Sequence, residues 1–309
     1  MTPGLRASRV RYAACFGALI VFTAAHAQTP EPPVSPGSTE SVTVHSRRQE
    51  DWTLSQRFLG SLLRPSYALK DQFATWKRPV CLRVNGMPSA SAHIVMERIR
   101  SIAEKIGAPL DRNESCAPNV VIIVSQEPQT ILNALKAKRT FLFAVSPVRD
   151  LQMHYPVQVW YYSLDRDYNG QYWPDVPLDG YGDTSNVLGL PAMKSHYTNL
   201  ETGIQPEMRL ATIIVDSAAI RGMALGTFAD YLALLSLTQA PVTGQCQPAP
   251  SIANLFLTDC DANFHTTSLS HVDLAMLTSI YQTPDEPERL QKVRIINNMR
   301  NNLEMAQQK

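Results

Sequence analysis

Residues 120–124 have the sequence Val-Val-Ile-Ile-Val, an unbroken run of β-branched side chains. Such a run predicts a strand that is buried on both faces of a sheet. Before it, apolar residues follow helical spacing from about 90 to 106, and Gly107 ends that pattern. After it, Pro128 opens a second helical pattern. The centre of the chain is therefore predicted to be a strand between two helices.

Further strands are predicted on either side of this segment. Residues 79–84 alternate in polarity, and residues 157–162 and 209–215 are rich in β-branched and aromatic side chains. Residues 216–309 are mainly helical by pattern, and Ser-His-Val-Asp at 270–273 has the form of a capping box. The predicted fold class is α/β (α+β), with a mixed sheet flanked by helices and a helical C-terminal part.

The predicted helix 218–237 is unusual because it is apolar on most sides from Gly222 to Leu237, as expected for a central helix. Ala218, Gly222 and Gly226 lie four residues apart and would form one ridge, which Asp230 continues. Glycine within a helix costs about 1 kcal/mol relative to alanine. Close packing along this ridge is the expected compensation.

Asp230 is the one charged residue from Gly222 to Leu237. A carboxylate there must find a partner, take up a proton or reach water. Two interpretations stay open. Asp230 is either a catalytic acid in a buried site, or it is a structural group in an ion pair or a helix-cap bond, with Arg209 or Arg221 as the candidate partners.

Residues 165–205 form a long polar connection with many turn-forming residues, and connections of this length are often functional. Two interpretations stay open for its aromatic side chains, which either form a partner-binding surface or fix the connection to the sheet. These candidates are Tyr168, Tyr172, Trp173, Tyr181 and Tyr197.

The first 27 residues have the pattern of a secretory signal peptide. Three arginines precede an apolar run of about 14 residues, and Ala-His-Ala at 25–27 fits a cleavage site. Residues 28–50 are predicted to be a flexible Pro-rich tether, within which 41–44 is a candidate edge strand. Residues 51–309 are predicted to be a single disulfide-stabilised α/β domain. Its sheet part covers about 76–215 and its helical part about 216–309.

Charge argues against a nucleic-acid partner. The chain of 309 residues has 28 Lys+Arg and 27 Asp+Glu, and loss of the three signal arginines would leave 25 basic against 27 acidic residues. Nucleic-acid-binding domains normally carry a basic surplus. No later apolar stretch is long enough for a transmembrane segment after signal cleavage. A periplasmic or secreted protein is expected, with another envelope protein as a candidate partner.

Four cysteines remain after residue 27, and an even number in an exported chain favours disulfides. Pairing of neighbours in the sequence joins Cys81 to Cys116 and Cys246 to Cys260. A zinc site is the alternative, but no C-x-x-C spacing is present.

Motifs for common catalytic chemistry are missing from the sequence. It has no G-x-S-x-G, Walker, G-x-G-x-x-G or EF-hand motif, and no cofactor is predicted. His265 and His271 lie near Asp259, Asp261 and Asp273 in the sequence, which makes the two histidines weak candidates for metal ligands. A solvated His271 at the start of a helix is the alternative.

The order of the predicted elements resembles the zincin fold of metallopeptidases, in which the helix after the last strand carries H-E-x-x-H. The predicted helix 218–237 has no histidine, so the zinc ligands cannot be transferred. Residues 75–300 also resemble a family of uncharacterised exported bacterial proteins. The shared motifs are Trp76 with Pro79-Val80-Cys81, the segment CAPNVV at 116–121, ADYLA at 229–233 and PSIANLF at 250–256.

The resemblance implies no activity. The expected function is therefore binding by a non-catalytic periplasmic or envelope protein. The alternative is a metallopeptidase-like hydrolase with an atypical site that uses Asp230 and a histidine.

Overall fold

The computed structural model describes residues 37–63, 72–113, 115–137, 152–167, 204–284 and 288–307. The chain divides into two units, residues 1–42 and residues 43–309. The sheet, both disulfides and the main hydrophobic core all belong to the second unit.

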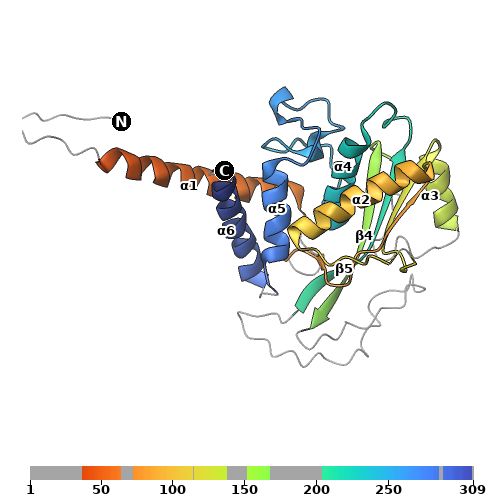
Figure 1. The fold of residues 1–309 in the computed structure, drawn as a ribbon, viewed down its shortest axis with the longest axis horizontal. Helices are drawn as coiled ribbons and strands as arrows, with labels where there is room; N and C mark the ends of the chain where they lie inside the picture. Colours follow the sequence, from red (N-terminus) through yellow and green to blue (C-terminus); the bar gives the residue numbers. More distant parts are fainter. Residues whose placement is uncertain are drawn as a thin grey trace, which may run out of the picture. The chain divides into compact units, whose positions relative to one another are not determined.

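The described residues contain a mixed five-stranded sheet, which confirms the predicted fold class (Figure 1). Its strands are β1 (Thr75–Trp76), β2 (Leu82–Asn85), β3 (Val120–Ser125), β4 (Val157–Asp167) and β5 (Ile204–Asp216). On one edge, β5 pairs in parallel with β3 and with the short β1, and β3 pairs in parallel with β2. On its other edge β5 pairs antiparallel with β4 from Ile204 to Val215. β5 is therefore the central strand.

Helices cover both faces of the sheet. The helices are α1 (Gly37–Leu62), α2 (Ser89–Ile106), α3 (Pro128–Ala137), α4 (Leu225–Leu237), α5 (His271–Gln282) and α6 (Glu288–Gln307), with 3-10 turns η3 (Ile252–Asn254) and η4 (Ala262–Phe264). Ile213 and Ile214 are neighbours in β5 and point to opposite faces. Ile213 belongs to the large core, whereas Ile214 packs in a small cluster with Leu132 of α3.

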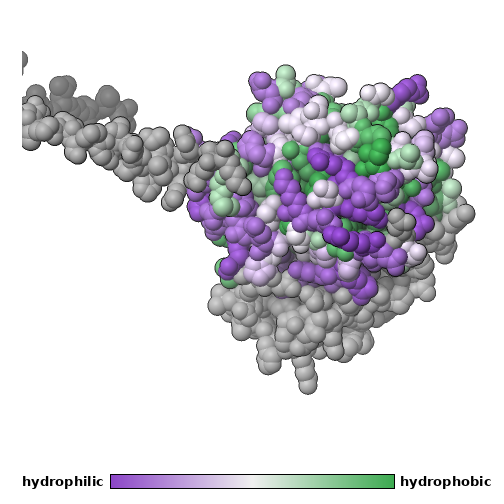
Figure 2. Space-filling view, viewed as in Figure 1, coloured by the Kyte–Doolittle hydropathy of each residue, from purple (hydrophilic) through white to green (hydrophobic). Residues whose placement is uncertain are grey.

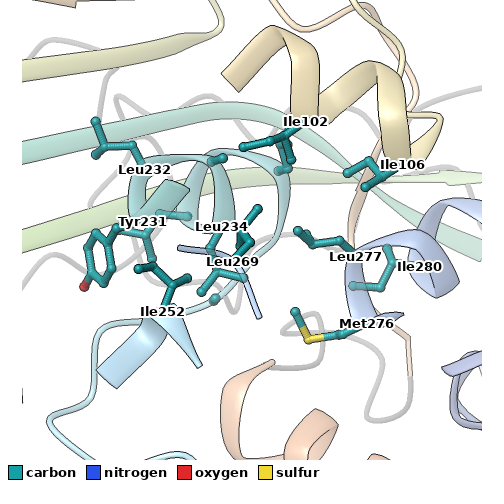
Figure 3. Close-up of a cluster of buried hydrophobic side chains, with 14 of the residues drawn as sticks. Ile102, Ile106, Tyr231, Leu232, Leu234, Ile252, Leu269, Met276, Leu277 and Ile280 are labelled. Atoms are coloured by element: carbon teal, nitrogen blue, oxygen red, sulfur yellow. The ribbon is translucent and has the colours of Figure 1, made fainter. Parts of the chain in front are cut away.

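The large core lies where α2, α4 and α5 meet. Ile102 of α2, Leu234 of α4 and Leu277 of α5 are among the buried side chains that converge there (Figure 3). Complete burial of one such side chain is worth about 1.5–3 kcal/mol. α2 has the local features of a stable helix, because its buried residues recur on one face and Gly107 ends it in the left-handed conformation with φ 80°.

β3 differs slightly from its prediction. Val120, Ile122 and Val124 are buried on the face of the large core, but the residues between them are only partly buried on the α3 side. The short α3 covers less of the sheet than the helices on the other face.

The predicted start of the helix 218–237 is wrong. α4 begins at Leu225, because residues 217–222 form turns in which Gly222 has φ 80°, a conformation that ends helical geometry. The predicted ridge of Ala218, Gly222, Gly226 and Asp230 therefore does not exist. At the other end of the chain, α1 includes residues 37–50 of the segment predicted as a tether, and it is helical at 41–44, for which a strand was a candidate.

Both predicted disulfides are present. Cys81 pairs with Cys116 across 35 residues, and Cys246 pairs with Cys260 across 14 residues. Asn119 supports the first crosslink, because its side chain accepts a hydrogen bond from the backbone N–H of Cys81 at 2.7 Å. No helix in the described ranges is long and apolar enough to cross a membrane.

Candidate functional site

Asp230 lies in α4 and forms a two-point ion pair with Arg98 of α2. Nε of Arg98 donates to Oδ1 at 2.6 Å, and Nη2 donates to Oδ2 at 3.0 Å. The backbone N–H of Leu269 also donates to Oδ2, at 2.9 Å. This carboxylate therefore joins α2, α4 and the segment that leads into α5.

The two partners differ strongly in burial. The Asp230 side chain is 1% exposed, whereas the Arg98 side chain is 48% exposed. The hydrogen bond to Asp230 raises the pKa of Arg98, so the guanidinium stays charged. With both oxygens engaged by three donors, the carboxylate is poorly placed to take a proton from a substrate or to bind a metal.

The arginine partner differs from the two that the sequence suggested. Arg209 instead lies 3.5 Å from Glu207, and Arg221 is exposed at the surface. Sequence reasoning missed Arg98 because it is 132 residues from Asp230 and no local pattern connects them. Its position in α2, directly before the buried Ile99, is the only local signal.

A second buried carboxylate, Asp273, joins two helix starts. It completes the predicted capping box with Ser270, whose hydroxyl accepts from the N–H of Asp273 and whose own N–H donates to Asp273. It also accepts from the hydroxyl of Ser251 at 2.6 Å and from the N–H of Ile252 at 2.9 Å. The sequence predicted the cap but gave no sign of the contacts to η3.

Burial raises the pKa of Asp273 even though hydrogen bonds from Ser251, Ile252 and Ser270 oppose this shift. The folded state therefore binds a proton more readily than the unfolded chain does. As pH rises from the ordinary pKa of an aspartate, near 4, to the higher pKa of the folded protein, this group loses stabilising free energy.

We expect Asp273→Ala to lower the free energy of unfolding by about 3 kcal/mol, because three buried donors lose their acceptor. Asp273→Asn retains one acceptor oxygen and should cost about half as much. Because Asn does not titrate, the deficit of Asp273→Asn should shrink as pH rises from 4 to 7. Urea unfolding at several pH values measures both effects, and a deficit that grows with pH would contradict the assignment.

The candidate metal ligands are not brought together. His265 ends η4 and His271 is the exposed first residue of α5. Asp261 caps η4 through the N–H of Asn263, and Asp273 is committed to the contacts above. Among the residues that the structure describes, no group of three His, Cys, Asp or Glu side chains could hold a metal ion.

Asp230 lines neither of two hollows found in the described part of the chain. One hollow of about 330 Å³ lies against α2, and its charged side chains are paired with each other, Arg100 with Glu97 at 2.6 Å and Arg112 with Glu104 at 2.7 Å. An apolar cavity of about 30 Å³ near the second disulfide has room for little more than one water molecule. Figure 2 shows a mainly hydrophilic face, with hydrophobic residues gathered near α4.

The candidate partner surface lies outside the described residues. This applies to Tyr168, Tyr172, Trp173, Tyr181 and Tyr197. The residues on either side are described, and Asp167 at the end of β4 is paired directly with Ile204 at the start of β5. The two ends of the connection therefore leave the sheet side by side.

Comparison of the chain with protein-family models, curated proteins and solved structures finds no match. The fold and the site define a disulfide-stabilised α/β protein with a mixed sheet. Two of the buried acids among the described residues, Asp230 and Asp273, link helices and turns through their hydrogen bonds.

Proposed function

We propose that this chain is an exported periplasmic or envelope protein that acts by binding another envelope protein, without catalysis. The observation that carries the proposal is the engagement of Asp230. It was the best candidate for a catalytic acid, and its two oxygens accept from Arg98 and Leu269. A group held in this way supports a scaffold better than it supports acid–base chemistry.

Export is part of the same proposal. The pattern of residues 1–27 predicts a signal peptide, and the two disulfides are typical of proteins in oxidising compartments. Disulfides that close loops of this size each contribute about 3 kcal/mol in the chain-entropy model. Such crosslinks suit a scaffold that must stay folded outside the cytoplasm.

The connection 168–203 is the proposed binding surface. Its sequence has five aromatic residues, a type enriched in protein interfaces. Its ends are fixed by the β4–β5 ladder, which pairs residues from Val157 to Asp167 with residues from Val215 to Ile204. Binding residues are often presented by a connection on a rigid framework of this kind.

A deletion tests this proposal. Replacing residues 168–203 by an Asn-Gly dipeptide should leave the scaffold folded, because Asp167 and Ile204 are directly opposed and a two-residue turn joins strands in that arrangement. Because a shorter loop costs less entropy to close, the free energy of unfolding should stay unchanged or rise by up to about 2 kcal/mol. Thermal unfolding measures this effect.

The binding readout is chemical crosslinking in intact exporting cells. The wild-type chain should form a defined crosslinked species with an envelope protein, and the deletion variant should lose it at equal abundance. The double variant Tyr172→Ala/Trp173→Ala should weaken the same species without a change of chain length. Arg112→Met, at the surface hollow of α2, is the matched control and should retain it. A crosslinked species that survives the deletion would contradict the assignment of the surface.

A further inference from the structure

The outer face of α6 carries an unusual share of the exposed apolar residues. In the part of the chain that the structure describes, the exposed large hydrophobic residues are Ile94, Leu290, Val293 and Met305, and the last three lie on α6. The opposite face of α6 is buried through Ile295, Ile296, Met299 and Leu303. The apolar residues of the outer face are therefore not needed for its packing onto the core.

The order of side chains on this outer face is symmetric about Met299. Asn297 and Asn301 lie two positions on either side of it, and Arg294 and Glu304 lie five positions on either side. Val293 and Met305 lie six positions on either side. Met299 itself is buried on the opposite face of α6 and marks only the level of the centre. Of the paired residues, Asn297 and Glu304 are partly exposed and the other four are exposed. Their spacing of three and four residues places them on one face of the helix.

We propose that this face binds a second copy of the same chain through antiparallel packing of α6 against α6. A twofold axis at Met299 makes each residue face the one equally far on the other side of Met299. Val293 would then meet Met305 of the partner copy, Arg294 would meet Glu304, and Asn297 would meet Asn301. Apolar, opposite-charge and amide pairs all match, and each pair occurs twice.

Leu290 strengthens the apolar ends of this contact. It lies one turn before Val293 on the same face, so the two side chains would flank the flexible Met305 of the partner copy. Glu304 is 26% exposed and lies 3.7 Å from Arg300 of its own helix. The contact therefore adds a second cation to Glu304 and does not require it to be unpaired.

The expected dimer is weak. A single-helix contact buries less than the roughly 800 Å² per partner that is usual for a stable complex. Sedimentation velocity of the mature chain at graded concentrations should show a reversible monomer–dimer equilibrium. Higher salt should weaken it, because exposed charge pairs contribute.

Charge reversal tests the register. Arg294→Glu and Glu304→Arg each create two like-charge contacts in their own homodimer, and each should lower the association constant by about tenfold. An equal mixture of the two variants restores opposite charges in the heterodimer, so it should associate more strongly than either variant alone. The double variant Arg294→Glu/Glu304→Arg should regain dimerisation within one chain. Arg112→Glu is the control, because it changes the charge by the same amount as Arg294→Glu but lies outside α6. It should dimerise like the wild type.

A chain that stays monomeric at all concentrations would overturn the proposal. So would a dimer whose association constant is unaffected by either reversal, or a mixture no stronger than its components. The double variant Val293→Glu/Met305→Glu gives a separate check. It should abolish the dimer, while its midpoint of thermal unfolding should stay close to that of the wild type. None of these results depends on the connection 168–203.

Discussion

Gly86→Ala should destabilise the fold by about 5 kcal/mol, the largest effect expected for a single methyl group in this protein. Gly86 has φ 83°, a conformation that costs a residue with a Cβ about 1–2 kcal/mol. A Cβ built there would also lie 1.9 Å from the carbonyl oxygen of Val124. That oxygen belongs to the backbone of β3, so relief requires the end of β2 to move away from β3.

Gly107→Ala is the matched control. Gly107 has nearly the same φ, 80°, but a Cβ there would meet nothing within 4 Å. The control should therefore cost only about 1–2 kcal/mol, which is the conformational part alone. Urea unfolding of both variants measures the difference. Equal losses would contradict the close approach of Gly86 to Val124.

Arg98→Met should lower the free energy of unfolding by about 4 kcal/mol, because it leaves the Asp230 carboxylate buried without its cation. Asp230→Asn should cost only about 2 kcal/mol, since the half-exposed Arg98 can turn to water and Asn can still accept from Leu269. The asymmetry follows from the difference in exposure, because the side chain of Asp230 is 1% exposed and that of Arg98 is 48% exposed.

The double variant Arg98→Met/Asp230→Asn gives the sharper test. It removes both charges, so it should be more stable than Arg98→Met alone although it has one more substitution. Arg112→Met is the control, because Arg112 is 78% exposed and its partner Glu104 is also at the surface. It should change stability by less than about 1 kcal/mol. Equal effects of Arg98→Met and Arg112→Met would contradict a buried structural pair.

Local patterns predicted much of this fold. The β-branched run at 120–124 became β3, the helical spacing before it became α2, and the capping box at Ser270 marks the start of α5. The disulfides were predictable because each cysteine pairs with its neighbour in sequence. In these cases the information lies within one element or one short loop.

The errors and omissions arose where distant contacts or backbone conformation decide the structure. The helical pattern from 218 onward does not indicate that Gly222 adopts positive φ. For this reason the start of α4 at Leu225 could not be predicted. The partner of Asp230 could not be found, since Arg98 comes from another helix far away in sequence. Asp273 was assigned as a local cap, and its link to η3 needs the folded arrangement of both helix starts.

We propose that Asp230 serves structure and that the chain binds rather than catalyses. Elemental mass spectrometry of the mature protein, isolated from the periplasm or culture medium without chelators or metal-affinity columns, tests this most directly. We expect substoichiometric transition metal in a fully folded protein. Stoichiometric zinc that is lost on Asp230→Asn, with thermal unfolding otherwise preserved, would contradict it and would favour a metallopeptidase-like hydrolase.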